Sequence, residues 1–477
     1  MAIFVKKLAD FMLTKNTPTG QLNFLMPGLR DQLRAKHPIY ILAGKIDWQI
    51  FEDAFSGLYS PDFGSPAKPI RLMVSLLILK HLRDVSDESI VEQWEENAYY
   101  QYFSGMAVFT PGPPCAASEL VHFRNRIGEN GIELIFKESI RVNGKDGQEQ
   151  DITADTTVQE KNITYPTDSK LHVKIINKCI GIAEREGVKL RQRYTFTVKE
   201  LRQAGRFRSH PKNRKKALAA DRKLKTIAGR LVRELERKLS EHILAFHRRK
   251  LDLFKKVLEQ SKDSKNKIYS IHEPHVQCIS KGKDHKKYEF GSKVSVLVTQ
   301  NTGVIVGALN MEGNPYDGHT LEPALGQYKK MQGKMPRSVT ADKGYRGVNK
   351  IEETQIHTPK PPTKQATKYQ KQKARKRFGR RAAVEPVISH LKQDYRLGRN
   401  YYTGIKGDNI NIMLSAAAMN FKRMINIWTD NPDSSLAFLK YTLARLFDKF
   451  YFPISQSTLV RPNRSWAFDL NIANLTF

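Results

Sequence analysis

Cysteine is scarce in this chain of 477 residues, with copies only at Cys115, Cys179 and Cys278. The three are far apart and show no Cys-x-x-Cys spacing, so the sequence supports neither a disulfide framework nor a zinc cluster. Long apolar runs are also missing, and the longest, residues 72–79, is much too short to span a membrane. The amino terminus places apolar residues before its first lysines, the reverse of a secretory signal, which predicts a cytoplasmic protein.

Acidic residues are few relative to basic ones. The chain has 48 Asp plus Glu against 80 Lys plus Arg, a formal net charge of +32. Such an excess destabilises a compact chain unless an anionic partner neutralises it. Nucleic acid is the first candidate for that partner. An acidic membrane is the second, but it calls for a basic amphipathic anchor. At this length, with 40% hydrophobic residues, the chain fits a folded protein of two to four domains.

One basic segment covers residues 181–260, with 24 Lys plus Arg against 9 Asp plus Glu, a net charge of +15. Its apolar residues Leu224, Ile227, Leu231 and Leu235 recur at helical spacing. The pattern predicts a helical insertion with a basic outer face. We favour contact of this face with nucleic-acid phosphates, and a solvated structural face is the alternative.

A second basic segment, residues 364–381, contains nine basic residues in eighteen and no acidic ones. Such a run cannot pack in a core and repels itself, so we expect it to be mobile on its own. Its cations Arg375, Lys376 and Arg377 are well placed to hold DNA beside the carboxylate of Glu385.

Two isolated aspartates stand in the same local setting. Asp155 follows Ile-Thr-Ala and Asp342 follows Val-Thr-Ala, and polar, turn-like residues come after each. Both are therefore predicted at or near strand ends. Asp151 competes with Asp155 for the first position, and we prefer Asp155 because its setting repeats that of Asp342.

A third carboxylate, Glu385, stands four residues after Arg381 and seven before Lys392. In a helix this spacing places the three side chains in one row. Pro386 requires the first turn of such a helix. The row alone is also typical of solvated helices. Three converging carboxylates, however, could hold two divalent ions for phosphoryl chemistry, and hard oxygen ligands select Mg²⁺ or Mn²⁺ over zinc.

At these residues the chain resembles a known family. Asp155, Asp342 and Glu385 are similar to the Asp-Asp-Glu triad of insertion-sequence transposases with a ribonuclease H-like core. Residues 153–168 and 314–320 also resemble insertion-sequence family five, so the resemblance spans roughly residues 40 to 425.

The spacing of Arg381, Glu385 and Lys392 matches the Tyr-x-x-Arg-x-x-x-Glu-x-x-x-x-x-x-Lys signature of families four and five. Phe378 stands at the tyrosine position, which removes a hydroxyl. What the tyrosine contributes in relatives is therefore not carried over to this chain.

The resemblance implies a DDE transposase that cleaves the ends of an insertion sequence and transfers the freed 3′-hydroxyl to target DNA. Two Mg²⁺ ions, for which Mn²⁺ substitutes, are expected on Asp155, Asp342 and Glu385, with Asp155 bridging them. Arg381 and Lys392 are expected to meet DNA phosphates. Double-stranded DNA is the expected partner, bound by a homodimer or larger assembly near the nucleoid. Two alternatives stay open: a metal-dependent nuclease or resolvase of the same fold, and an inactive DNA-binding regulator.

The expected fold class is α/β, a ribonuclease H-like mixed sheet flanked by helices, with an all-α amino-terminal domain and a basic helical insertion after the first core strand. We predict a leader at 1–40 and a helical DNA-binding domain at 41–145. A catalytic domain in two pieces is predicted at 146–170 and 268–428, with the insertion at 171–267 between them and an extension at 429–477.

Pattern and turn residues also predict individual elements. A helix from Ser118 is expected to expose His122, Arg124 and Arg126, either for DNA contact or as the basic surface of a plain helical bundle. Asp317 and His319 fall in a predicted loop, where turn chemistry is the commoner explanation and contact with a phosphate or metal the alternative. Strands are expected at 149–158, 268–271, 288–299, 304–311, 338–341 and 354–357, and residues 300–303, ending in Gly303, are expected to form a hairpin turn between the strands at 288–299 and 304–311. Helices are expected at 69–82, from 86, where Ser86 can act as the cap, from 118, and at 321–331, 410–424 and 436–447.

Overall fold

The computed structural model describes residues 11–12, 27–60, 65–261, 263–280, 286–360 and 366–429. The helix predicted at 436–447 lies outside these residues. Contacts divide the chain into two compact units, residues 1–426 and 427–477. In the described part of the chain, no helix has both the length and the apolar character needed to cross a membrane.

The amino-terminal region is helical and is built around α5 (Ile70–Leu82), whose residues are buried almost throughout. A helix that is apolar on all sides belongs inside a bundle, and α4 and α8 pack against it. Ser86 caps α6 as predicted, accepting a hydrogen bond from the Ser89 N–H at 3.1 Å. The surrounding helices are α2 (Leu29–Gln32), α3 (Pro38–Lys45), α4 (Gln49–Ser56), α6 (Asp87–Glu96), α7 (Ala98–Phe103) and α8 (Ala117–Val142).

Arg124 of α8 is not exposed, and that expectation was wrong. Its side chain is buried, and its guanidinium donates to both carboxylate oxygens of Asp87 at 3.0 and 3.1 Å. Lys80 also binds Asp87, at 2.7 Å. Helical spacing alone placed Arg124 outside, but paired hydrogen bonds to a carboxylate compensate its burial.

The central sheet is mixed, with seven strands in the order β4-β5-β3-β7-β9-β8 and β6 on β5. β3 pairs with β5 antiparallel and β5 with β6 antiparallel, whereas β7 is parallel to both β3 and β9. This is the ribonuclease H-like arrangement predicted from the sequence. The strands are β3 (Asp151–Glu160), β4 (Gln277–Ser280), β5 (Tyr288–Thr299), β6 (Ile305–Met311), β7 (Ser338–Thr340), β8 (Lys350–Ile351) and β9 (Thr354–His357).

The predicted hairpin is confirmed. β5 and β6 flank a turn in which Gly303 has a φ of 72° and donates its N–H to the Thr299 carbonyl at 3.2 Å. The strand predicted at 268–271 is wrong, and β4 forms the edge there instead. The Gln260 side chain donates to the Ile268 carbonyl and accepts from its N–H, so these backbone groups bond to a side chain rather than a strand.

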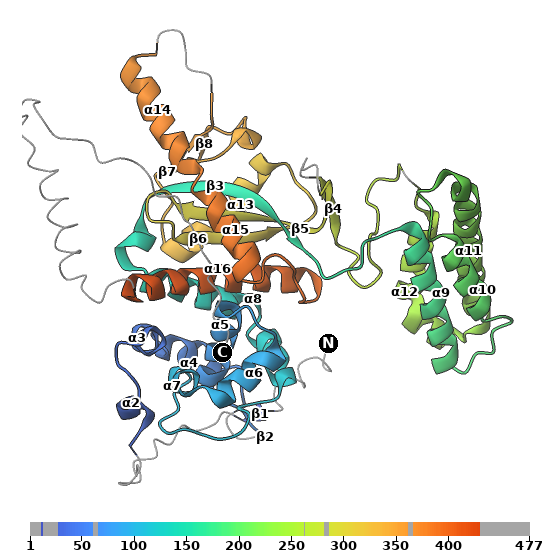
Figure 1. Ribbon diagram of the computed structural model, residues 1–477, viewed down its shortest axis with the longest axis horizontal. Coiled ribbons are helices and arrows are strands. Elements are labelled where there is room, and N and C mark those ends of the chain that lie inside the picture. Colours follow the sequence, from blue (N-terminus) through green and yellow to red (C-terminus); the bar gives the residue numbers. More distant parts are fainter. Residues whose placement is uncertain are drawn as a thin grey trace, which may run out of the picture. The chain divides into compact units, whose positions relative to one another are not determined.

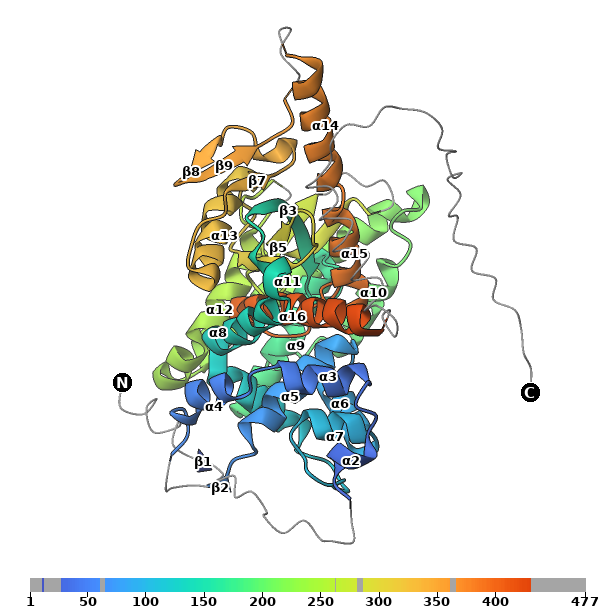
Figure 2. The same cartoon turned by 90° about the vertical axis from the view of Figure 1, so that its left-hand side faces the viewer.

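Helix α16 (Gly404–Thr429) lies between the sheet and α8 (Figures 1 and 2). The buried side chain of Asn420 joins both neighbours. It accepts from the Ile305 N–H and donates to the Ile305 carbonyl, both at 2.9 Å, and it also donates to Ser139 Oγ at 3.1 Å. One amide thus continues the hydrogen bonding of β6 and fixes α8 beside it.

Helices α9 (Asp168–Arg185), α10 (Thr195–Ala204), α11 (Pro211–Lys238) and α12 (Glu241–Glu259) form the insertion after β3. They share a hydrophobic core of their own. The predicted stripe of Leu224, Ile227, Leu231 and Leu235 is at most 2% exposed and faces inward. The basic residues between these positions therefore lie outside.

A buried charge cluster, which we call the ion cluster, joins the two ends of the insertion. Lys161, just after β3, pairs with Asp408 of α16 at 2.5 Å and with Glu273 at 3.6 Å. His275, on the returning chain, donates from Nε2 to Oδ2 of the same Asp408 at 3.1 Å. The chain therefore leaves and re-enters the core at one point.

Gly291 marks the closest approach of β5 to β3. An added Cβ would overlap the Gln159 carbonyl oxygen. We expect Gly291→Ala to lower the free energy of unfolding, measured by urea denaturation, by about 1–3 kcal/mol or more. Gly326→Ala on α13 (Asp317–Gln332) is the control, because no atom lies within 4 Å of its added Cβ. It should raise stability by about 0.5–1 kcal/mol, and equal effects of the two substitutions would contradict the assigned packing.

Candidate active site

The pairing of β3 with β7 brings two of the predicted carboxylates to the same level of the sheet. The strands are parallel, and Thr153 lies opposite Thr340. Asp155 and Asp342 each follow two residues after this pair. Since both strands run in the same direction, the two aspartates reach the same edge of the site.

Asp342 stands just after β7, as predicted. Its Oδ1 accepts the Gly344 N–H at 2.7 Å and caps the short helix η2 (Lys343–Tyr345). Asp155 is different, because β3 continues to Glu160 and remains paired with β5 to its end. The expectation of a strand end at Asp155 was wrong.

Glu385, the third predicted carboxylate, comes from a helix rather than from the sheet. α14 (Lys368–Arg381) ends and α15 (Val384–Asp394) begins close to one another, and Pro386 occupies the first turn of α15 as predicted. Proline cannot donate to the carbonyl four residues earlier, which explains the break after Arg381. Figure 2 shows the two helices following one another end to end.

Arg381 connects the sheet to this helix. Its Nη1 lies 3.7 Å from Asp155 Oδ2, and its Nη2 lies 3.6 Å from Glu385 Oε1. These are ion-pair distances rather than hydrogen bonds. The Glu385 side chain is 66% exposed, so it has room to turn. The structure thus brings Arg381 and Glu385 to Asp155, which is far from both in the sequence.

Lys392 reaches the sheet. Its Nζ is 3.8 Å from Oε1 of Glu289, a buried residue of β5, and its side chain is 24% exposed. The four-residue step from Arg381 to Glu385 crosses the break between α14 and α15 and still brings these two side chains together, whereas the seven-residue step from Glu385 to Lys392 lies within α15.

Asp151, the competing first aspartate, is engaged at the start of β3. It accepts from Arg337 Nε at 3.1 Å and from Ser338 Oγ at 2.7 Å. The Arg337 hydrogen bond lowers the pKa of Asp151. The residue therefore ties β3 to the beginning of β7.

Asp317 is a neighbour of the site. The sequence interpretation placed it in a loop and gave contact with a phosphate or metal only as the alternative. It is the first residue of α13, which begins before the predicted position 321. Its Oδ1 accepts from Thr156 Oγ1 and from Lys293 Nζ, both at 3.0 Å. The Thr156 bond places this carboxylate next to the residue that follows Asp155. An aspartate in the first turn of a helix is the signal that could have located it.

Gly344 shows how close Asp317 and Asp342 are. A Cβ built on this glycine would lie 2.9 Å from Asp317 Oδ2 and 2.9 Å from Asp342 Oδ1. The buried phenol of Tyr345 stands beside them. Burial raises its pKa well above the usual value, and the charges of Asp155, Asp317 and Asp342 raise it further. The charges of Asp155, Asp317 and Asp342 thus all reach one buried phenol.

The donor chemistry of the triad fits hard divalent cations, since all three predicted ligands are carboxylates. Among the described residues, no three His, Cys, Asp or Glu side chains stand together in a metal-holding arrangement. Arg381 lies between Asp155 and Glu385. An ion on both carboxylates therefore requires Arg381 to withdraw and Glu385 to turn inward.

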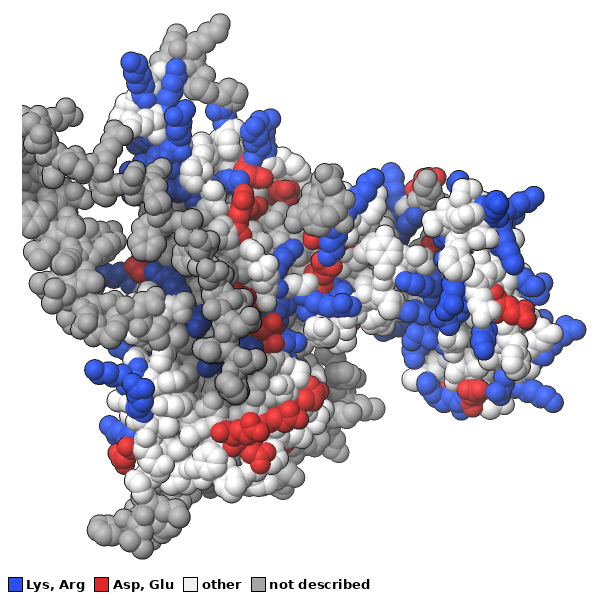
Figure 3. Space-filling view, in the orientation of Figure 1, with Lys and Arg blue, Asp and Glu red and all other residues white. Residues whose placement is uncertain are grey.

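The basic tract is helical from Lys368 to Arg381, and its mobility stays a prediction. Thr367 and Gln370 form a capping box that starts α14. No α14 residue is buried, and Lys and Arg cover its surface (Figure 3). Arg375 and Lys376 are exposed, whereas Arg377 is half-buried and its carbonyl accepts from Gln300 Nε2 at 3.2 Å.

Comparison with known proteins agrees with this geometry. A family model described as "Transposase domain (DUF772)" matches residues 28–126, and one described as "Transposase DDE domain" matches residues 260–421. The chain belongs to the DDE-type transposases, phosphoryl-transfer enzymes of DNA transposition that work with divalent metal ions.

One relative is a Rhizobium meliloti protein described as "Uncharacterized protein ORF8 in nfe locus". It is 40% identical over 190 residues, which cover 38% of this chain and 91% of the relative. No solved structure shows significant similarity to the chain.

The contacts of Asp317 generate a prediction. Asp317→Asn keeps the size of the side chain but removes the charge that holds Lys293 beside β3, so metal-dependent DNA cleavage should fall about 10–100-fold. DNA binding should stay unchanged. Asp394→Asn, an exposed position on α15, is the matched control and should cleave at the wild-type rate. Wild-type cleavage by Asp317→Asn, or equal losses in both variants, would contradict this role.

Proposed function

We propose that this transposase belongs to the insertion-sequence family five group, related to family four, and cleaves and joins the ends of its own element. The observation that carries the proposal is the in-register pairing of β3 with β7 beside the Arg381 contacts. It supports a common site for Asp155, Asp342 and Glu385. The spacing of Arg381, Glu385 and Lys392 supports the family assignment.

In this proposal Asp155, Asp342 and Glu385 would hold two Mg²⁺ or Mn²⁺ ions. When bound, such ions activate the attacking oxygen and stabilise the leaving oxygen of a phosphodiester. The residues of the chain hold the DNA strand in line. Water attack then releases a 3′-hydroxyl at the element end, and that hydroxyl attacks a target phosphodiester with loss of the target 3′-oxygen.

Arg381 has two roles in this scheme. Without metal or DNA it offsets the charges of Asp155 and Glu385, which would otherwise repel one another. With metal and DNA bound, Arg381 would no longer be needed for that task, and its guanidinium, whose planar fork suits phosphate, would turn to the DNA backbone. Lys392 supplies a second cation to the strand.

The proposed domains follow the sequence boundaries. Residues 41–145 recognise the element ends, 146–170 with 268–428 carry the chemistry, and 171–267 add phosphate contacts. A leader at 1–40 and an extension at 429–477 complete the chain. The protein acts as a homodimer or larger assembly on double-stranded DNA, in the cytoplasm with the nucleoid.

The triad gives the main test. Asp155→Ala, Asp342→Ala and Glu385→Ala should each abolish cleavage and strand joining but bind DNA nearly as well as wild type, because metal ligation serves chemistry and basic surfaces serve affinity. Cleavage and joining are measured on a plasmid carrying the gene with its flanking DNA.

Asp151→Ala serves as the competing variant and should remain active. An inactive Asp151→Ala beside an active Asp155→Ala would overturn the choice of the first aspartate. Cleavage without joining by the wild-type protein would favour the nuclease or resolvase alternative. Binding without any metal-dependent cleavage would favour a regulator.

Helix α14 gives a separate test. Arg375, Lys376 and Arg377 replaced together by Ala should flatten the slope of log affinity against log salt by roughly two to three units, at about 0.9 per phosphate. Binding should weaken equally on element ends and unrelated DNA, because backbone contacts do not read sequence. An unchanged slope would place the tract in solvent, and a loss confined to element ends would make it part of sequence recognition.

A further inference from the structure

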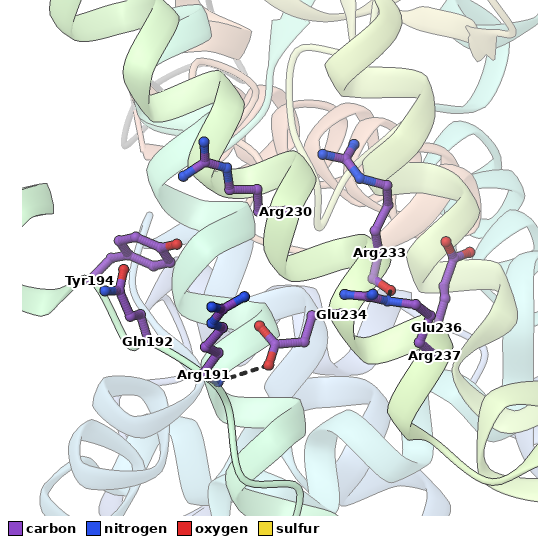
Figure 4. Close-up of a pocket in the computed structure, with 8 residues that line it drawn as sticks. All are labelled: Arg191, Gln192, Tyr194, Arg230, Arg233, Glu234, Glu236 and Arg237. Carbon is purple, nitrogen blue, oxygen red and sulfur yellow. Dashed lines mark hydrogen bonds between the residues drawn. The ribbon is translucent and has the colours of Figure 1, made fainter.

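The insertion carries a groove that the predicted active site does not use. Two adjoining hollows of about 680 and 580 Å³ share Gln192, Tyr194 and Arg230. One wall is the exposed side of α11, and the other is the connection between α9 and α10. Figure 4 shows Arg191, Arg230, Arg233 and Arg237 around the larger hollow.

The α11 wall is a row of arginines at helical spacing. From Arg222 the row passes Thr226, Arg230, Arg233 and Arg237, in steps of four, four, three and four residues. Such steps keep the side chains on one face of the helix. At 1.5 Å per residue the row extends about 22 Å. The row is therefore too long for a single small anion, and its length matches that of several consecutive phosphates of a nucleic-acid strand.

These cations have no carboxylate partners within the described residues. Arg191, Arg222, Arg230, Arg233 and Arg237 make no ion pair there. Charges left unpaired in a row repel one another and attract a polyanion. The groove therefore presents its full positive charge to solvent.

The two acidic residues in the lining are already engaged. Glu234 Oε1 accepts the Arg191 N–H and Lys238 Nζ, both at 2.7 Å, and the Lys238 hydrogen bond lowers the pKa of Glu234. Glu236 pairs with Lys255 at 2.5 Å. The first contact is drawn in Figure 4 and fixes the loop wall against α11. The carboxylates thus shape the groove rather than neutralise its arginines.

We infer that this arginine groove binds the phosphate backbone of duplex DNA, an inference that rests on the proposed function. Arginine forks pair with phosphate oxygens through two parallel hydrogen bonds. Phosphates advance about 3.4 Å along the axis per strand, so a row of about 22 Å spans about six steps. Gln192, Thr197 and Thr226 add neutral hydrogen-bonding groups that suit backbone oxygens.

The groove is distinct from the proposed contacts of α14, since all its residues belong to the insertion. A grip of this kind adds affinity without selecting a sequence. We assign it to holding DNA that extends beyond the nucleotides at the triad.

The test compares two triple variants with equal charge loss. Arg230→Ala, Arg233→Ala and Arg237→Ala together should flatten the salt slope of binding to unrelated duplex DNA by roughly two to three units. The control replaces Lys329, Lys330 and Lys334, exposed residues on α13 and just after it that lie outside the insertion and the proposed DNA contacts, and should change the slope by less than one unit. Alanine favours helix, and thermal unfolding checks that both variants fold.

Equal slopes for the groove variant and wild type would overturn the inference, and so would equal losses in both variants, which would reflect net charge alone. A loss of binding confined to RNA or to a short inorganic polyphosphate would also overturn it.

Cleavage by the wild-type protein of the plasmid carrying the gene with its flanking DNA is measured in parallel. If the wild-type protein does not cleave this plasmid, the proposed function is rejected. If it does cleave, but the groove variant has the wild-type salt slope of DNA binding, only the groove inference is rejected. At DNA-saturating protein the groove variant should still cleave.

Discussion

The parallel pairing of β3 with β7 is the constraint on which the site depends. The two strands are far apart in sequence, and Ile152 and Val339 lie opposite one another with no exposed surface. A shift of one residue would turn the side chains of one strand to the other face of the sheet, so burial of these apolar residues fixes the register. The same register fixes the heights of Asp155 and Asp342. Packing of the core and placement of the carboxylates are thus one requirement.

Charge is divided between interior and surface in a consistent way. Acidic residues are used inside, where Asp87 holds Lys80 and Arg124 and Asp408 holds Lys161. Many basic residues remain outside, on α14 and on the insertion helices. Breaking a buried pair leaves an uncompensated charge and is costly, whereas an exposed cation is free to exchange water for a phosphate. A polyanion partner therefore completes a charge balance that the fold leaves open.

The sequence predicted much of the fold, because alternation and turn residues report directly on the local backbone. β5 has its predicted bounds, and the Gly303 turn and the Ser86 cap were identified from local chemistry. The errors arose where a side chain bonds to a residue outside its own helix or strand. Arg124 is buried because Asp87 reaches it, and the backbone at Ile268 is satisfied by Gln260.

The candidate site follows the same division. Spacing predicted the Arg381 and Glu385 contact, because it lies within adjoining helices. The contact of Arg381 with Asp155 needed the sheet to be assembled, and the place of Asp317 beside Gly344 needed α13 to begin earlier than its apolar residues suggest.

The ion cluster at Lys161, Glu273, His275 and Asp408 has a consequence for the history of the chain. It closes a detour of more than a hundred residues, so that the core strands on either side keep their positions whatever lies between. The helices of the detour bury their own apolar residues and so do not depend on the sheet for a core. A segment with these properties can be lengthened, shortened or exchanged by recombination between genes while the catalytic core is inherited intact. The same catalytic site can in this way be combined with different DNA-binding insertions.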